Sequence, residues 1–92
     1  MTAAPSGLDR QRIDRWLWHA RIVRTRSAAA ALAKSGHIRV NGARVRAPGR
    51  MVRAGDVITV ALERAVRVLK VGGFVDRRGA AAAAQALYEE LT

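Results

Sequence analysis

The chain has 92 residues, with 17 lysines and arginines against seven aspartates and glutamates, and a formal net charge of +10. This length suits one small domain and leaves no room for a large catalytic domain beside it. The absence of cysteine excludes disulfides, thiolate metal sites and a cysteine nucleophile; His19 and His37 lack ligand spacing, so no metal or other cofactor is predicted. No apolar run is long enough for a signal peptide or a membrane span, which predicts a cytoplasmic protein that does not bind membranes.

The positive charge is concentrated in one stretch of the chain. Between Arg15 and Arg53 there are nine arginines and one lysine but no aspartate or glutamate, whereas the other 53 residues hold seven cations and seven carboxylates. Concentrated like charge repels itself and opposes compaction, so a sequence that keeps it indicates a polyanion as its usual neighbour. Nucleic acid is the first interpretation.

Two helices are predicted in the first part of the chain, after a flexible leader at residues 1–9. The first runs from Arg10 to Val23, because apolar residues recur there at spacings of three and four. Thr25 is a good N-cap for a second helix from Arg26 to Lys34, and Gly36 is suited to end it. The inward face of this second helix is predicted to consist of Ala28, Ala31 and Leu32.

A hairpin is predicted next, because Asn41-Gly42 between two alternating runs is the strongest short hairpin signal. A two-residue turn there sets the register: Val40 pairs with Ala43, Arg39 with Arg44, Ile38 with Val45, and His37 with Arg46. Further strands are predicted at Val57–Val60 and Val66–Val71, followed by a C-terminal helix over residues 80–91. The fold class is α+β, with two N-terminal helices packed on a small, mostly antiparallel sheet that contains the Asn-Gly hairpin, plus the C-terminal helix.

The predicted hairpin sets cation against cation. One face is apolar, while the other places Arg39 opposite Arg44 and a partly charged His37 opposite Arg46. Directly opposed like charges destabilise a hairpin, so their presence without a neighbouring carboxylate indicates a surface that binds an anion. Guanidinium groups bind phosphate in a bidentate fork, which makes phosphate the expected anion.

Polar and cationic residues also gather around the joint between the two helices: Arg21, Arg24, Thr25, Arg26, Ser27 and, two turns on, Lys34. The start of the second helix offers unpaired N–H groups and the positive end of the helix dipole, which suit an anion. Arginines there oppose the dipole, so they favour binding over stability. A purely solubilising role for these cations is the alternative.

The two tryptophans are expected to differ. Trp16 lies on the core face of the first helix. Trp18, two residues on, points elsewhere and either stacks on a base or, the favoured interpretation, packs against later strands or the C-terminal helix. Phe74 and Tyr88 are also expected to pack. Without an aromatic platform, nucleic acid would be recognised by its shape and backbone charge.

Four motifs together resemble a known family. They are Arg12-Ile13-Asp14-Arg15-Trp16-Leu17-Trp18, Arg24-Thr25-Arg26-Ser27, Gly36-His37-Ile38-Arg39-Val40-Asn41-Gly42 and Gly55-Asp56-Val57-Ile58. In combination, over residues 12–60, they resemble the RNA-binding domain named after ribosomal protein S4. The Trp-Leu-Trp run and the small size are similar to the bacterial, ribosome-associated heat shock protein 15 branch of that family.

The resemblance implies a helix-helix-hairpin fold whose basic face binds structured RNA. It further implies a target, the large ribosomal subunit with nascent-chain tRNA, in ribosome recycling or quality control under stress. We therefore expect a non-enzymatic protein that docks on ribosomal RNA of the large subunit and is monomeric when free. The family's RNA-binding residues fall on Arg15, Arg21, Arg24, Thr25, Arg26, Ser27, Lys34, Arg39, Asn41, Gly42, Arg44 and Arg46. The expected division is a leader at 1–9, the S4-type domain at 10–62, and a strand and helix at 63–92 that pack on the same domain.

Two other classes of function compete with this one. An RNA-targeting accessory domain of an RNA-modifying enzyme, such as a pseudouridine synthase, is the main alternative, although the carboxylates are scattered and form no catalytic constellation. A DNA-reading helix-turn-helix would need base-reading side chains along its recognition helix, and residues 28–33 offer mostly methyl groups.

Overall fold

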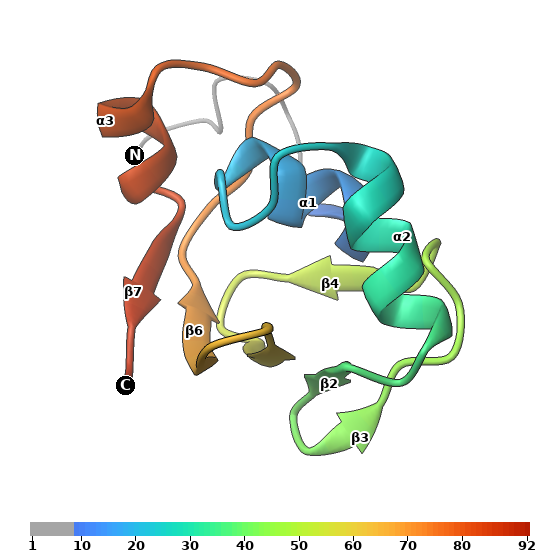
Figure 1. Ribbon diagram of the computed structural model, residues 1–92. Helices are drawn as coiled ribbons and strands as arrows, with labels where there is room; N and C mark the ends of the chain where they lie inside the picture. Colours follow the sequence, from blue (N-terminus) through green and yellow to red (C-terminus); the bar gives the residue numbers. More distant parts are fainter. Residues whose placement is uncertain (1–8) are drawn as a thin grey trace.

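The computed structural model describes residues 9–92, so the leader expected at residues 1–9 lies almost entirely outside the described residues. Helices and strands alternate irregularly along the chain (Figure 1). In order they are β1 (Arg10–Arg12), α1 (Ile13–His19), α2 (Arg26–Lys34), β2 (Ile38–Val40), β3 (Ala43–Arg44), β4 (Met51–Arg53), β5 (Val57–Ala61), β6 (Val66–Val71), α3 (Ala81–Gln85) and β7 (Tyr88–Glu90).

The strands form two antiparallel sheets, one of five strands in the order β3-β2-β5-β6-β7 and one of two strands, β1 and β4. Helices α1 and α2 pack against each other on one side of the larger sheet (Figure 1). The α+β class with an antiparallel sheet is therefore confirmed. Alternation along the strands turns one face of the sheet inward, where the core lies. Its fully buried side chains include Ile13, Trp16, Leu17, Ala29, Ala33, Ile38, Ile58, Val60 and Leu69.

The first predicted helix is too long at both ends. Residues 10–12 form β1, in which Gln11 pairs with the fully buried Val52 of β4, and the helix proper ends at His19. The backbone of Arg21 then takes a left-handed conformation with φ of 60°, which a helix cannot contain. Residues 10–12 are extended because they pair with β4. The spacing of apolar residues within one segment cannot predict a pairing with a distant segment, so the predicted helix began too early.

The second predicted helix is confirmed with its bounds, from Arg26 to Lys34, but its inward face is shifted by one residue. Ala29 and Ala33 are fully buried and Leu32 is half-buried, whereas Ala28 and Ala31 are exposed. Both buried residues are alanines, and such small side chains let the two helices approach closely. Gly36 ends the segment with φ of 82°, as expected of a residue after a helix.

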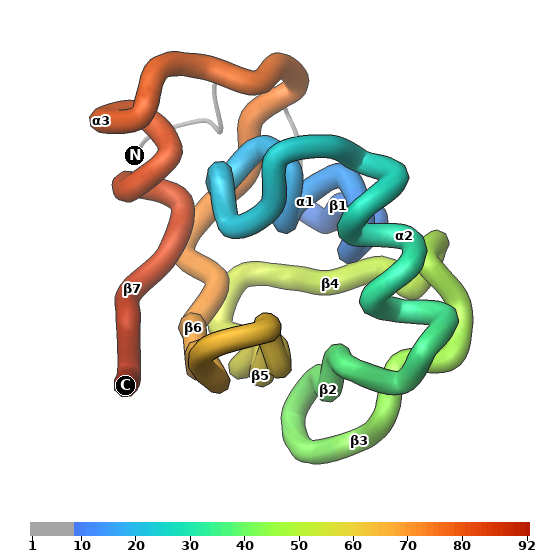
Figure 2. The backbone as a smooth tube through the Cα atoms, viewed as in Figure 1, coloured from blue at the N-terminus to red at the C-terminus, as the bar shows by residue number. Residues whose placement is uncertain are grey.

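The predicted C-terminal helix is wrong over most of its length. Only Ala81–Gln85 is helical, and Tyr88–Glu90 instead adds strand β7 to the edge of β6, as Figure 2 shows. The Leu87 carbonyl accepts hydrogen bonds from the N–H groups of Gly72 and Gly73, which draws the chain onto the sheet. Tyr88 then meets Trp16 edge to face, with ring centroids 6.4 Å apart. Core packing and strand pairing therefore keep residues 88–90 from continuing the helix, although the alanine tract before them has high helix propensity.

Candidate nucleic-acid interface

The tip of the β2–β3 hairpin has the geometry that the Asn-Gly pair predicts. Asn41 and Gly42 both have positive φ, 52° and 84°, as a two-residue turn of the primed type requires. The side chain of Asn41 is hydrogen-bonded within the protein, because its Nδ2 donates to Asp56 Oδ1 at 3.1 Å and its Oδ1 accepts from the Val57 N–H at 2.9 Å. Asn41 therefore holds the turn against β5 and leaves the backbone of Gly42 exposed at the tip.

The predicted register is observed in the hairpin. Val40 pairs with Ala43 and Arg39 with Arg44, and the Val45 N–H donates to the Ile38 carbonyl at 2.9 Å. Strand β3 ends at Arg44, so no strand pair is formed between His37 and Arg46. Arg39 Nη1 donates to the Gly42 carbonyl at 3.3 Å, which directs this guanidinium toward the tip.

A cavity of about 210 Å³ lies between the end of α2 and the hairpin. Its lining residues are Lys34, Ser35, Gly36, Arg44, Val45 and Arg46. The Arg44 guanidinium passes close to Gly36, where a Cβ would lie 3.2 Å from Arg44 Cζ; since the exposed Arg44 side chain can move aside, the positive φ is the reason for glycine here. Three predicted site cations thus surround one hollow of a size that can admit a phosphate group.

The start of α2 carries a second group of predicted site residues. Thr25 caps the helix, its Oγ1 accepting from the Ala28 N–H at 3.0 Å, so this hydroxyl oxygen satisfies one of the free N–H groups of the first turn. Arg24, Arg26 and Ser27 are exposed around it. Arg26 and Ser27 belong to the first turn of α2, and Lys34 at the other end of the same helix lines the cavity.

Two predicted site residues point elsewhere. Arg15 Nη2 donates to the Asp76 carbonyl at 3.0 Å, and Arg21 donates to the Gly79 carbonyl through Nε at 3.0 Å and Nη2 at 2.8 Å. Together with Gln11 and Trp16, which donate to the Val75 and Gly73 carbonyls, they fasten the segment 73–79 onto α1. These two arginines therefore hold the chain together, and the structure does not bring them to the hairpin.

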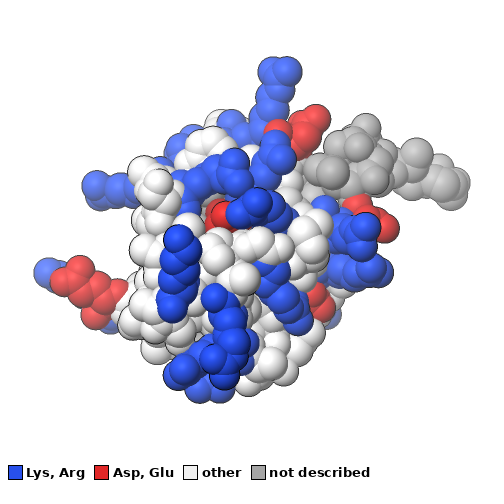
Figure 3. All heavy atoms as spheres, turned by 90° about the vertical axis from the view of Figure 1, so that its right-hand side faces the viewer, with Lys and Arg blue, Asp and Glu red and all other residues white. Residues whose placement is uncertain are grey.

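The cations of residues 15–53 remain almost unpaired with carboxylates. Among residues 9–92 the ion pairs are Arg12–Asp14, Arg26–Asp14 and Arg67–Glu90, and only Arg26 belongs to the carboxylate-free stretch. Figure 3 views the side on which α2 and the hairpin lie, and lysine and arginine side chains cover much of it. We call this surface the basic face; its residues are Arg24, Arg26, Ser27, Lys34, Arg39, Gly42, Arg44 and Arg46.

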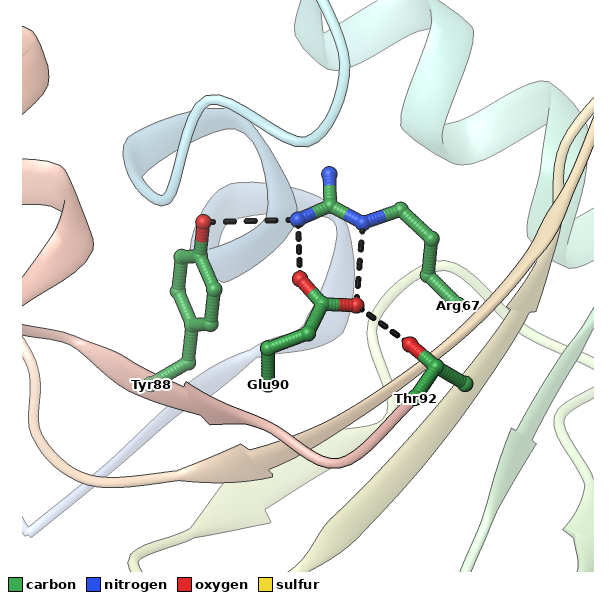
Figure 4. A network of polar contacts seen from close by, with 4 residues as sticks. All are labelled: Arg67, Tyr88, Glu90 and Thr92. Atoms are coloured by element: carbon green, nitrogen blue, oxygen red, sulfur yellow. Dashed lines mark hydrogen bonds and ion pairs between the residues drawn. The ribbon is translucent and has the colours of Figure 1, made fainter.

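The acidic end of the chain is held at another place. Arg67 of β6 pairs with Glu90 of β7 and donates to the Tyr88 hydroxyl at 3.4 Å, while Thr92 Oγ1 donates to Glu90 at 2.6 Å (Figure 4). Because of Arg67 the pKa of Glu90 is lowered, and the pKa of Arg67 is raised in turn. Glu90 is thereby tied to a cation of its own sheet, and it does not neutralise the basic face.

Arg12 is a residue near this surface that the sequence did not single out. Its guanidinium forms a bidentate pair with Asp14, which raises the pKa of Arg12. The sequence feature that could have identified Arg12 is Asp14, a carboxylate immediately before the long stretch that has no aspartate or glutamate.

Trp18 packs as the favoured interpretation predicted: it is half-buried against the core, and Arg78 lies 5.6 Å from its ring centroid. Phe74 and Tyr88 also pack against the core.

Comparison with known proteins relates this geometry to a family. A family profile described as the S4 domain matches residues 11–58, which include both N-terminal helices and the hairpin. The heat shock protein 15 homolog of Aeromonas salmonicida is 45% identical over 82 residues, and heat shock protein 15 of Escherichia coli K12 is 33% identical over 79 residues. Each alignment covers 86% of this chain and 59% of the relative, so the chain spans about three fifths of the length of these relatives.

Two further relatives agree with this match. The small ribosomal subunit protein uS4 of Rhodopseudomonas palustris is 46% identical over 54 residues, or 59% of this chain and 26% of that protein. A structure described as trimeric Vibrio cholerae heat shock protein 15 has a TM-score of 0.83 at 34% identity and covers 89% of this chain and 82% of that one. The chain belongs to the S4 domain family of RNA-binding modules, and within it to the heat shock protein 15 branch.

Two further observations concern the described part of the chain. No helix within residues 9–92 has the length and apolar character needed to cross a bilayer. In the same residues no group of three or more histidines, cysteines or carboxylates is arranged to hold a metal ion.

Proposed function

We propose that the protein binds structured RNA through the basic face, with the phosphate backbone as the main ligand. The observation that carries this proposal is the segregation of charge: the cations on α2 and the hairpin lie on one side of the molecule, and within residues 9–92 Arg26 alone among them is ion-paired with a carboxylate. Guanidinium groups that are exposed and unpaired can exchange their counterions for phosphates, which drives association with a polyanion. The family supports RNA as the polyanion.

The RNA proposed is ribosomal RNA of the large subunit, with nascent-chain tRNA beside it, and the role is ribosome recycling or quality control under stress in the cytoplasm. The heat shock protein names of its relatives and the match to a ribosomal protein support this assignment. The proposed contacts are the residues of the basic face, with Thr25 and Asn41 holding the helix start and the hairpin tip in place. We propose no catalytic step, since binding alone accounts for these residues.

Crosslinking in cells followed by sequencing of the attached RNA tests the proposal. We expect large-subunit ribosomal RNA and tRNA to be enriched over messenger RNA. Enrichment of small-subunit or messenger RNA alone would reject the proposed target while leaving RNA binding intact. Turnover in an assay for uridine isomerisation on ribosomal RNA would favour an RNA-modifying role instead.

The free protein is proposed to be a monomer, although the structure of the Vibrio cholerae relative is described as trimeric. Sedimentation equilibrium without RNA distinguishes the two states. A mass three times that of the 10.0 kDa chain would contradict the proposal.

A further inference from the structure

A buried carboxylate lies beside the basic face. The side chain of Asp14, in the first turn of α1, is 6% exposed. Its Oδ1 accepts from Arg12 Nε at 3.1 Å and its Oδ2 from Arg12 Nη2 at 2.9 Å. The same Oδ1 lies 3.9 Å from Nη2 of Arg26, at the start of α2. One carboxylate therefore holds cations from two separate segments next to each other.

The two arginines are open to solvent although the carboxylate beneath them is not. The side chains of Arg12 and Arg26 are 50% and 45% exposed. The Arg12 guanidinium also lies against the loop after the hairpin, where a Cβ on Gly49 would be 3.7 Å from its Cζ. Arg12 gives two of its N–H donors to Asp14 and keeps the others, and the Arg26 contact is too long to be a hydrogen bond. Donors of both side chains remain available to a ligand.

The burial of Asp14 is offset by its pairing with Arg12, but a carboxylate beside a surface proposed to bind a polyanion would weaken that binding unless it has another role. Two guanidinium groups this close repel each other when no anion lies between them. Asp14 supplies that anion and fixes the position of Arg12, so less side-chain freedom is lost when a ligand binds.

We infer that Asp14 is a positioning residue of the RNA interface, and that it presents Arg12 and Arg26 together to neighbouring phosphate oxygens. The inference rests on the proposed function and adds Arg12 to the contact surface. It reverses the expectation from charge alone, under which removal of any carboxylate from a polyanion-binding protein strengthens binding.

The substitution Asp14→Asn tests the inference because it removes the charge and keeps the shape. We expect the dissociation constant for a structured ribosomal RNA fragment to rise about tenfold, and the steepness of its salt dependence to fall by about one in log–log slope for each phosphate that is no longer bound. Glu63→Gln is the matched control, since Glu63 is an exposed carboxylate in the β5–β6 turn and the charge change is the same. We expect that control to bind as tightly as the unmodified protein, or more tightly.

Equal or tighter binding by a folded Asp14→Asn variant would overturn the inference and leave the proposed function intact, whereas no RNA binding by the unmodified protein would overturn the proposed function itself. A second measurement does not depend on the folding of any variant. In ¹⁵N spectra of the arginine Nε–H groups of the unmodified protein, added RNA should shift the Arg12 and Arg26 signals and leave that of Arg67 in place. Unchanged Arg12 and Arg26 signals at saturating RNA would also overturn the inference.

Discussion

Arg39 and Arg44 lie directly opposite each other across the two strands of the β2–β3 hairpin, and both are exposed. A pair of like charges at opposed positions weakens a hairpin, and no carboxylate among the described residues pairs with either of them. This repulsion is unfavourable for the isolated protein, and a phosphate bound to either guanidinium group would offset it. A charge reversal at one of these two arginines should therefore raise the free energy of unfolding and lower the affinity for RNA.

The first prediction is that Arg44→Glu stabilises the protein and weakens RNA binding. The substitution turns a repulsive cross-strand pair into an attractive one, which should raise the free energy of unfolding by about 0.2–1 kcal/mol. The same variant should bind RNA at least tenfold more weakly, because the substitution removes one cation that faces phosphate and adds a repulsive charge. Urea denaturation and RNA titration of one preparation measure both effects.

The double variant Arg39→Glu with Arg44→Glu is the matched control for the hairpin. It restores a like-charge pair, so its stability should return to near that of the unmodified protein, while co-sedimentation with ribosomes should be abolished. Its helical circular-dichroism signal should be unchanged. Normal co-sedimentation of this folded variant would remove the hairpin from the interface.

The second prediction concerns Thr25, whose hydroxyl oxygen caps α2. Thr25→Ala should lower the free energy of unfolding by about 0.5–2 kcal/mol, since one N–H of the first turn loses its partner. Thr25→Ser keeps the capping oxygen and should retain most of that stability. If Thr25→Ala is instead fully stable but defective only in RNA binding, the hydroxyl serves the ligand and not the helix.

The third prediction is that Trp16→Ala unfolds or nearly unfolds the protein. Trp16 is fully buried and its Nε1 donates to the Gly73 carbonyl at 3.1 Å. The loss of a large buried ring costs about 3–5 kcal/mol, a large fraction of the stability of a small domain. Trp16→Phe keeps most of the volume and should be milder. A thermal melt of both variants checks the order.

The fourth prediction is a loss of stability as the pH falls through the range of histidine titration. Burial lowers the pKa of His19 below its ordinary value of 6.5, and repulsion from Arg15 lowers it further. The unfolded chain then binds a proton before the folded one does, so the free energy of unfolding should decrease as the pH falls below about 6.5. Among residues 9–92 no group hydrogen-bonds to the buried Nδ1 of His19, and the backbone of Val75 and the charge of Asp76 oppose the lowering of the pKa only in part.

Urea denaturation at several pH values between 5 and 8, with and without His19→Gln, measures this effect. The variant should lose the slope in this range, whereas His37→Gln, at an exposed site, should keep it. The lowered pKa of Glu90 acts in the same direction, but only in the more acidic range where carboxylates titrate. An unchanged slope in His19→Gln would show that another group is responsible.

Elements with local signals were predictable from the sequence. The Asn41-Gly42 pair fixes the hairpin turn, and Thr25 and Gly36 mark the limits of α2, because each acts through hydrogen bonds or backbone angles of its nearest neighbours. The three-residue strands β1, β4 and β7 were not predictable in this way. Each exists only because a distant segment pairs with it, and periodicity in so short a run carries little information.

In the candidate site, too, features set by neighbouring residues were predictable and features set by distant contacts were not. The opposition of Arg39 and Arg44 followed from the local register of the hairpin. The engagement of Arg15 and Arg21 could not be foreseen, because their carbonyl partners lie 61 and 58 residues further along the chain. Charge segregation in the sequence therefore indicated the kind of ligand, while packing decided which arginines give donors to the protein's own carbonyls.

The salt dependence of RNA affinity tests the central claim most directly. The dissociation constant of the unmodified protein for a structured ribosomal RNA fragment would be measured over a range of salt concentrations. If the basic face contacts about six phosphates, the log–log slope of the association constant should be roughly −4 to −5. A slope near zero would contradict an interface built on unpaired guanidinium groups and phosphates.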